Sequence, residues 1–332
     1  MHLQSVGYNV VIISRDKDIT TKLLDLYSLP HIKLTSAKSR ISGILSELII
    51  YQAKAHKILS EYKIDLALSI GGTFIAQACY LLKIPLIVFT DTEFNFSNKF
   101  SFPFAKIIAT PTCYRGNLGS RQLRYDGYHE LAYLHPNYFR ADKTVLEEIG
   151  IKESEKFFVV RKTSGRAIEN IGQALLTNDE LINLVGILEK TGKVILTVEG
   201  EIPSILERNV VSVQPNKIHS LLYYAHLFVG DSLTMFTESA LLGTPSISIS
   251  SEGFLLGNFD EICNRYTLGF RFRSFRDALR KIQILLNKGE LKNDWLVKRK
   301  KLLSEKRDVT QFQLDLIDSF TNKKSIALSL SC

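Results

Sequence analysis

Cysteine is scarce in this sequence, and none of the usual cysteine signatures is present. The chain has four cysteines in 332 residues, and no two of them form a C-x-x-C pair. They are Cys79, Cys113, Cys263 and Cys332. This usage excludes a disulfide-stabilised scaffold and a cysteine-based metal site, and it is typical of free thiols in a reducing compartment.

A long uninterrupted apolar run is also missing. The chain begins MHLQSVGYNV, without the charged start and apolar stretch of a signal peptide. Its most apolar stretch, residues 64–89, contains a double glycine, a lysine and a proline. Because a transmembrane helix needs about 20 consecutive apolar residues, we expect a strand, a helix and a second strand here. We therefore expect a cytoplasmic protein.

The positive charge of the chain is concentrated near its C-terminal end. The formal net charge is +8, and residues 271–307 alone contain 13 Lys or Arg against four acids. A solvated helix face is the simplest interpretation of this segment. The alternative is peripheral contact with anionic lipids of the inner membrane surface or with a phosphorylated acceptor. No recognition motif for nucleic acid accompanies the charge, so no nucleic-acid partner is expected.

Short apolar runs alternate with helical periodicity along both halves of the chain. Strands are expected at residues 10–14, 66–70, 85–89, 107–109, 157–160, 194–198, 210–213, 227–229 and 246–249. Helices are expected at residues 19–27, 41–61, 74–82, 180–191, 219–225, 237–242, 275–287, 295–306 and 311–321. This alternation predicts an α/β fold with doubly wound parallel sheets. The length of the chain and a break around residues 133–142 predict two Rossmann-like domains.

The first sheet is expected to differ at its start. Residues 6–8 look like the end of a helix that would follow an opening strand, and the next apolar run begins at residue 10. Either the first strand, turn and helix are absent, or a different strand fills the gap. The turn in question ordinarily lines the ligand-binding edge of such a sheet.

One segment of the second half has the features of an anion-binding helix start. Residues 229–247, VGDSLTMFTESALLGTPSI, read as strand, polar turn, helix and next strand. Asp231, Ser232 and Thr234 fall where a helix N-terminus presents unpaired N–H groups, which favour phosphate. Glu238 follows one turn later, placed to accept hydrogen bonds from ribose hydroxyls. The alternative is an ordinary N-cap with an acid nearby.

This segment resembles the donor-nucleotide motif of the GT-B superfamily. The superfamily includes the peptidoglycan lipid-intermediate N-acetylglucosaminyltransferase and the non-hydrolysing UDP-N-acetylglucosamine 2-epimerases. The shared pattern is a small polar turn, a glutamate, a glycine five residues later and a proline, matched by Glu238, Gly243 and Pro245. The resemblance implies that Glu238 binds the ribose of UDP and that Ser232 and Thr234 contact the diphosphate.

Residues 84–108 are similar to another stretch of the same transferase. There an acid near a strand end precedes an Asn-Lys pair, which is Asn98-Lys99 in this chain. Asp91 and Glu93 follow an expected strand, where a general base belongs, so they are the candidate catalytic residues. A turn cap is the alternative role for both.

A third segment, residues 159–170, follows the first strand of the second half with the sequence VVRKTSGRAIEN. A loop at this position faces the diphosphate in the superfamily. Arg161 is therefore expected to pair with phosphate oxygens, and Thr163 and Ser164 to donate hydrogen bonds. A basic surface loop is the alternative. Glu199 follows the next expected strand in the same facing position.

Over residues 8–270 the chain is identified as a member of an uncharacterised family of bacterial and archaeal proteins, predicted to be glycosyltransferases. The resemblance is carried by ISRDKDITTKLLDLY, FTDTEFNFSNKFSFPFA, YDGYHELAYLHPNYF, IHSLLYYAHLFVGDSLTM and ESALLGTPSI. His219 begins a helix in the fourth of these phrases and is interpreted as a helix cap. The resemblance implies a GT-B fold, with domains facing across a cleft: residues 1–140 on the acceptor side, 141–310 for the nucleotide sugar, and 311–332 as a C-terminal helix and tail.

Three functions remain open at this point. The first is glycosyl transfer from a UDP-type nucleotide sugar to a glycan or lipid-linked acceptor, in cell-surface polysaccharide or glycolipid biosynthesis. No cofactor and no metal are expected, since no Asp-x-Asp pair follows a strand. The second is UDP-N-acetylglucosamine 2-epimerisation, although Gly71-Gly72-Thr73 replaces the turn in which the epimerases carry an acid. The third is a non-catalytic sugar-nucleotide-binding protein.

Overall fold

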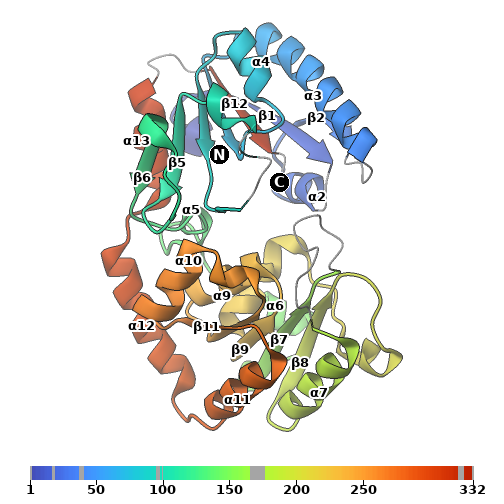
Figure 1. Cartoon of the computed structure of the whole chain (residues 1–332). Helices are drawn as coiled ribbons and strands as arrows, with labels where there is room; N and C mark the ends of the chain where they lie inside the picture. The colour runs from blue at the N-terminus through green and yellow to red at the C-terminus, as the bar shows by residue number, and fades with distance from the viewer. Residues whose placement is uncertain are drawn as a thin grey trace. The chain divides into compact units, whose positions relative to one another are not determined.

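The computed structural model of the chain forms two compact units (Figure 1). It describes residues 2–16, 19–36, 41–94, 98, 100–164, 176–320 and 325–330. Unit 1 comprises Met1–His129 and Asp308–Cys332, and unit 2 comprises Glu130–Arg307. We expected a first domain ending at residue 140 and a separate C-terminal helix and tail. In the structure the first unit ends earlier and includes the C-terminal segment.

Unit 1 is built on one parallel sheet of seven strands in the order β2-β1-β12-β3-β4-β5-β6. The strands are β1 (Asn9–Asp16), β2 (Ile32–Ser36), β3 (Leu66–Ile70), β4 (Leu86–Phe89), β5 (Ile107–Pro111), β6 (Gln122–Tyr125) and β12 (Ser325–Leu330). The helices of unit 1 include α1 (His2–Ser5), α2 (Thr20–Leu26), α3 (Ile41–Glu61), α4 (Ala76–Leu81) and α13 (Val309–Phe320). The doubly wound parallel sheet predicted for the first half is confirmed.

The C-terminal strand β12 lies inside this sheet, between β1 and β3. Ala327 is opposite Val11 of β1 and opposite Ala67 of β3, and both pairings are parallel. Ile326 has no exposed surface, at 0%. Of the two alternatives that the sequence left open, a different strand therefore occupies the place beside β1.

Helix α13 attaches to the same unit. Its buried residues are Val309, Phe312, Leu316 and Ile317. The ring of Phe312 stacks on Tyr125 of β6 with 4.9 Å between ring centroids, and Asp318 accepts a hydrogen bond from the hydroxyl of Tyr8. The expected C-terminal helix is thus present, and together with β12 it packs within unit 1, because α13 has an apolar face and β12 has a buried residue.

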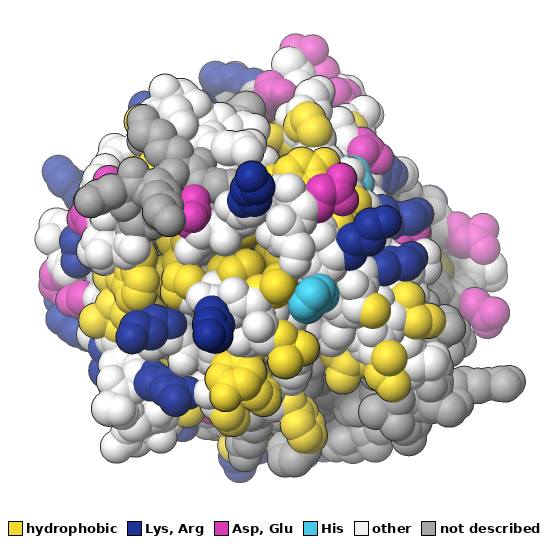
Figure 2. Space-filling model, turned by 90° about the horizontal axis from the view of Figure 1, so that it is seen from above, with side chains coloured by type: hydrophobic (Ala, Val, Ile, Leu, Met, Phe, Trp, Pro, Cys, Tyr) yellow, Lys and Arg dark blue, Asp and Glu magenta, His cyan; other side chains and the backbone are white. Residues whose placement is uncertain are grey.

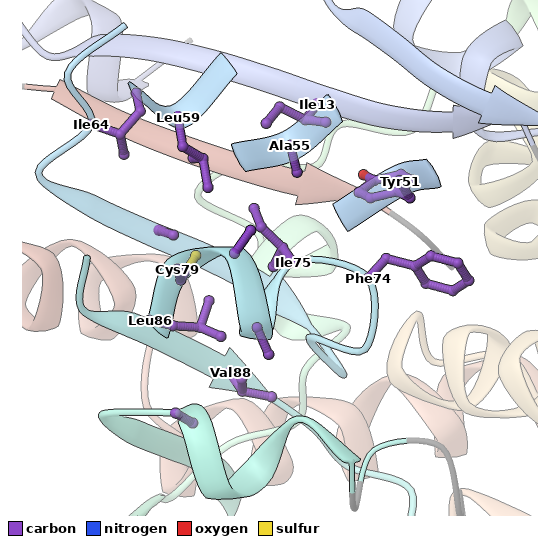
Figure 3. Close-up of a cluster of buried hydrophobic side chains, with 14 of the residues drawn as sticks. Ile13, Tyr51, Ala55, Leu59, Ile64, Phe74, Ile75, Cys79, Leu86 and Val88 are labelled. Atoms are coloured by element: carbon purple, nitrogen blue, oxygen red, sulfur yellow. The ribbon is translucent and has the colours of Figure 1, made fainter. Parts of the chain in front are cut away.

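Helices α3 and α4 pack on one face of this sheet and supply much of its core. Figure 3 shows Leu59 of α3 and Cys79 of α4 pointing into a cluster with Ile13 of β1 and Val88 of β4. All four side chains are fully buried, at 0% exposure. Burial raises the pKa of the Cys79 thiol to about 12, so the thiol stays protonated and acts as a small apolar group.

Unit 2 is built on a parallel sheet of five strands in the order β11-β10-β9-β7-β8. The strands are β7 (Phe157–Lys162), β8 (Lys193–Val198), β9 (Leu227–Gly230), β10 (Ser246–Ile249) and β11 (Gly269–Phe272). The helices of unit 2 include α5 (Leu131–Leu134), α6 (Thr144–Glu148), α7 (Asn178–Leu188), α8 (Ile218–Tyr224), α9 (Leu233–Leu241), α10 (Gly257–Asp260), α11 (Phe275–Leu286) and α12 (Leu291–Glu305). A strand expected at 210–213 is reduced to one bridge, between Leu196 and Val210.

The basic segment at residues 271–307 proves to be partly internal. Lys292 of α12 donates hydrogen bonds to the carbonyl oxygens of Tyr223 and Ala225, at 2.6 and 3.1 Å, at the end of α8. Arg299 donates through Nε to the carbonyl oxygen of Leu241, the last residue of α9, at 2.8 Å. Lys and Arg side chains near a helix C-terminus can donate hydrogen bonds to its unpaired carbonyls. Two basic side chains of this segment therefore fix the ends of α8 and α9 in unit 2 through hydrogen bonds.

The surface of the chain is mixed in character. Apolar side chains gather on the face that Figure 2 shows, with Lys and Arg beside them. The exposed large apolar residues of unit 1 include Ile49, Tyr80, Leu81 and Phe100, which are between 59% and 70% exposed. No helix in the described part of the chain is both long and apolar enough to span a membrane.

Candidate functional site

The ends of two neighbouring strands form the centre of the candidate site in unit 2. β7 pairs in parallel with β9, and Arg161 lies opposite Gly230 in this register. A Cβ atom on Gly230 would lie 2.7 Å from the carbonyl oxygen of Arg161, so glycine is needed for this close approach. Ligands of open α/β sheets bind beyond the carboxyl ends of the strands. The loops after β7 and β9 therefore meet at the edge where a ligand is expected.

Asp231 connects these two loops. Only 3% of the residue is exposed, and its Oδ1 accepts a hydrogen bond from the backbone N–H of Thr163 at 2.8 Å. Burial raises the pKa of the Asp231 carboxyl, and the backbone hydrogen bond from Thr163 opposes this shift. We expected Asp231 to contact a nucleotide. Its observed hydrogen bond is to the protein, and it fixes the loop that follows β7.

Arg161 pairs with an acid that directly follows the adjacent strand β8. Its guanidinium forms an ion pair with Glu199, and Oε2 of Glu199 also accepts from the backbone N–H of Ser164 at 3.4 Å. Residues 165–170 of the predicted loop lie outside the described residues. The expected phosphate-binding residues Arg161, Thr163 and Ser164 thus lie together at the end of β7, the strand between β8 and β9.

Three polar atoms of this cluster are buried without a hydrogen-bond partner. They are Nε of Arg161, Oγ1 of Thr163 and Oδ2 of Asp231, considered among the described residues. Leaving such an atom unsatisfied costs about 1–3 kcal/mol. A polar ligand would supply the missing partners. The cluster therefore has the chemistry of a binding site for a hydrogen-bonding molecule.

Ser232 caps helix α9, directly after this cluster. Its Oγ accepts a hydrogen bond from the backbone N–H of Met235 at 3.4 Å. The alternative role that we gave to this side chain, an N-cap, is thus observed. Thr234 lies in the first turn and its side chain is exposed. The first N–H groups of a helix have no partner within it, and the helix dipole favours anions there. Through its backbone, the start of α9 is suited to phosphate.

Glu238 lies one turn after Thr234, on the same face of α9. Only 7% of the residue is exposed. Its Oε1 accepts two hydrogen bonds, from the hydroxyl of Tyr133 at 3.0 Å and from Nε2 of His219 at 2.9 Å. We interpreted His219 as a helix cap, but the N-cap of α8 is Lys217, and no side-chain cap is formed there. That interpretation of His219 was wrong.

Tyr133 was not identified from the sequence as a site residue. It lies on α5, 105 residues before Glu238. Nothing in the spacing of LAYLHPNYF indicates a contact with a helix of the nucleotide motif, and only tertiary packing reveals it. The sequence indicated His219 only weakly as a site residue. It carries a polar ring and lies in α8, the helix before the one that carries Glu238.

The glycine of the motif has a structural explanation. Gly243 has φ of +81° and ends α9, with its N–H donating to the carbonyl of Ala240 at 3.0 Å. A backbone with positive φ favours glycine. A Cβ atom on Gly243 would also lie 2.8 Å from Cδ of Arg299. Gly243 therefore fixes where α9 ends, and the chemistry of the motif lies in its polar residues.

The candidate catalytic acids belong to unit 1 and follow β4. Oδ1 of Asp91 accepts from the hydroxyl of Thr92 at 3.1 Å, and Oε1 of Glu93 accepts from the backbone N–H of Arg115 at 3.1 Å. Burial raises the pKa of the Tyr114 hydroxyl, and the charges of Glu93 and Asp91 raise it further. Both acids thus lie near one phenol at the carboxyl edge of the unit 1 sheet. Lys99 of the expected Asn-Lys pair lies outside the described residues.

Comparison with solved structures assigns the fold. A UDP-GlcNAc 2-epimerase from Methanocaldococcus jannaschii is 12% identical, with a TM-score of 0.61 over 94% of this chain and 99% of that chain. A UDP-GlcNAc 2-epimerase from Neisseria meningitidis, solved bound to UDP-GlcNAc, is 11% identical, with a TM-score of 0.62 and coverages of 94% and 99%. MurG from Acinetobacter baumannii is 14% identical, with a TM-score of 0.58 and coverages of 96% and 93%. The predicted GT-B type of fold, with two Rossmann-like domains, is confirmed.

Sequence comparison assigns the family. A protein of Methanocaldococcus jannaschii described as "Uncharacterized protein MJ0665" is 23% identical over 263 residues, which are 73% of this chain and 74% of that protein. The sequence pattern of a family described as "Protein of unknown function (DUF354)" matches residues 1–262, well over half of the chain. The resemblance to an uncharacterised family related to the epimerases and the transferase is thereby confirmed. The chain belongs to the DUF354 family.

Proposed function

We propose that unit 2 binds a UDP-type nucleotide sugar at the ends of β7 and β9. One observation carries the proposal: Nε of Arg161, Oγ1 of Thr163 and Oδ2 of Asp231 are buried without partners among the described residues, immediately before α9 begins. A diphosphate offers acceptor oxygens to the arginine, to the hydroxyl and to the first N–H groups of the helix.

The proposal assigns a protonated carboxyl to Asp231, because an ionised one would repel the phosphates. Burial raises the pKa of this carboxyl above its ordinary value, which is the direction that this role requires. A protonated carboxyl donates one hydrogen bond and accepts others. Oδ2 of Asp231 would then donate to a phosphate oxygen, while Oδ1 keeps its hydrogen bond from Thr163.

The ribose of this sugar nucleotide is proposed to contact Glu238. Glu238 lies one turn after Thr234 on the same face of α9. This separation suits the spacing between a ribose and its diphosphate. The Neisseria meningitidis epimerase that shares this fold was solved with UDP-GlcNAc bound. This likeness supports UDP as the first nucleotide to test.

Glycosyl transfer is the reaction that we propose for the whole chain. Transfer needs a base for the acceptor hydroxyl and stabilisation of the leaving diphosphate. Asp91 or Glu93 of unit 1 is proposed as the base, and Arg161 with the start of α9 as the stabilising groups. The acceptor is proposed to be a glycan or a lipid-linked sugar of the cell surface, processed in the cytoplasm or at the inner face of the membrane.

Two other functions are kept as outcomes of the same experiments. Epimerisation is disfavoured because the turn after β3 is Gly71-Gly72-Thr73, without the acid that the epimerases carry there. A non-catalytic sugar-nucleotide-binding protein would bind the nucleotide and release no product. Incubation with UDP-N-acetylglucosamine separates the three, because it yields the manno epimer, free UDP with an acceptor, or neither.

The first experiment is a thermal-shift screen against UDP, GDP, CMP and dTDP sugars. A ligand that binds only the folded chain raises its apparent stability with the logarithm of ligand concentration. We expect the largest shift with UDP sugars. Glu238→Ala is expected to lose most of this shift, whereas Glu207→Ala, which removes an exposed glutamate of the same unit, is expected to keep it. Absence of a shift with every nucleotide would overturn the proposal.

A further inference from the structure

The carboxylate of Glu238 is held through one of its two oxygens. Oε1 accepts from Tyr133 at 3.0 Å and from His219 at 2.9 Å. A carboxylate oxygen has two lone pairs, so these donors fill its hydrogen-bonding capacity. An ionised carboxylate only accepts, and Nε2 of His219 therefore carries the proton in this contact. Among the described residues no hydrogen bond reaches Oε2, which is left as the accepting oxygen.

The two donors are fixed by their own packing. The rings of Tyr133 and His219 lie 5.3 Å apart at an interplanar angle of 34°. Phe139 meets His219 edge-on, at 6.4 Å and 85°. The helix that carries Tyr133, α5, contacts α9 directly. An aromatic cluster from three segments of unit 2 thus sets the orientation of one carboxylate.

We infer that Tyr133 and His219 are positioning residues, which orient Glu238 so that Oε2 accepts a hydrogen bond from one ribose hydroxyl. The inference rests on the proposed nucleotide site. With either donor removed, the carboxylate gains rotational freedom, and ordering it again on binding lowers the affinity for the hydroxyl. The pair would therefore determine how strongly the site selects a ribose over a deoxyribose.

The selectivity for the hydroxyl is the quantity to measure. Dissociation constants for UDP, 2′-deoxy-UDP and 3′-deoxy-UDP are determined by calorimetry for the full chain. A hydrogen bond to a charged group corresponds to a preference of about tenfold or more. We expect the wild-type chain to bind UDP at least about tenfold more tightly than the analogue that lacks the recognised hydroxyl.

The variants separate positioning from a general structural role. Tyr133→Phe and His219→Leu are expected to reduce this preference to below about threefold, with little change in the affinity for the deoxy analogue. His219→Gln is expected to retain it, since the glutamine Nε2 donates from a similar position. Tyr138→Phe is the matched control, because Tyr138 is 43% exposed and Tyr133 is 40% exposed. A merely structural effect would weaken UDP and both analogues equally.

The outcomes distinguish this inference from the proposed function. If the wild-type chain shows no affinity for UDP, the proposed nucleotide site is wrong and the inference falls with it. If the wild-type chain prefers UDP and both Tyr133→Phe and His219→Leu keep that preference, the inference alone is wrong. Should Tyr133→Phe fail to fold, the comparison of His219→Leu with His219→Gln decides: equal preferences in these two variants would overturn the role of His219 and with it the proposed pair.

Discussion

The backbone N–H of Thr163 donates to the buried carboxyl of Asp231 at 2.8 Å, which joins the loop after β7 to the loop after β9. This single hydrogen bond connects two segments that are 68 residues apart in the sequence. Its acceptor is an acid whose second oxygen has no partner among the described residues. The burial of this acid and its position between the two loops lead to measurable consequences.

Replacing Asp231 by asparagine is expected to alter how stability depends on pH. Burial raises the pKa of the folded carboxyl above its ordinary value of 3.8. At a pH between the pKa of the unfolded chain and the higher pKa of the folded chain, the folded chain binds more protons. Stability therefore falls as pH rises through this window. Asp231→Asn removes the titration and keeps an acceptor for Thr163. Chemical denaturation from pH 4 to 7 should therefore show a stability advantage of the variant that grows with pH.

The ion pair between Arg161 and Glu199 is expected to compete with a bound diphosphate. Arg161→Met should weaken UDP binding by about tenfold or more, because a charge-assisted hydrogen bond is lost. Glu199→Gln should leave UDP affinity unchanged or increase it, since Arg161 then gives up no ion pair. Titration calorimetry measures both. Arg208→Met, which breaks the exposed pair of Arg208 with Glu189, is the control and should have no effect. Weaker binding by Glu199→Gln would contradict the competition.

Lys292 is expected to give the chain a stability that rises with pH. Burial of its ammonium group lowers the pKa to about 7 from an ordinary value of 10.5. Between these values the unfolded chain binds more protons than the folded chain, so stability increases with pH by up to about 1.4 kcal/mol per pH unit. Denaturation curves at pH 7 and pH 9 should show this rise for the wild-type chain and for Lys300→Met. Lys292→Met should lose it, and should be less stable at both values because two carbonyls at the end of α8 lose their donor.

Strand β12 is expected to be essential for unit 1. Ile326 is fully buried between two strands that do not otherwise pair, so Ile326→Ala should cost about 2–5 kcal/mol. The loss should be confined to the unfolding transition of unit 1 and should leave that of unit 2 unchanged. Differential scanning calorimetry with limited proteolysis separates the two transitions. An equal loss in both units, or none in unit 1, would show that β12 is dispensable in solution.

Local sequence patterns predicted most of the regular structure and the region of the site. The apolar run at residues 66–70 is β3, and the run at 227–229 is most of β9, because short buried strands leave a direct apolar signature. The polar turn at Asp231 and Ser232 is indeed a strand end followed by a helix. These features depend on residues that are close together in the sequence, so a local pattern is enough to predict them.

The parts that the sequence did not predict depend on distant contacts. β12 reads as a short polar and apolar mixture, SIALSL, and only its pairing with β1 and β3 makes it a strand. The contact of Tyr133 with Glu238 joins residues 105 apart. The burial of Asp231 follows from packing on all sides, which no local pattern records. The pairing of Arg161 with Glu199 likewise depends on the order of strands in the finished sheet.

The position of β12 also sets the order in which the chain is completed during translation. Strands β1 and β3 leave the ribosome before unit 2 is made, yet the strand that joins them is synthesised only after unit 2. All of unit 2 is made in between, and domains generally fold as they emerge. In the nascent first unit the facing edges of β1 and β3 therefore stay unpaired until β12 has been synthesised. A fusion or tag placed directly after β12 is therefore expected to affect the insertion of β12 between β1 and β3, which is a step of folding.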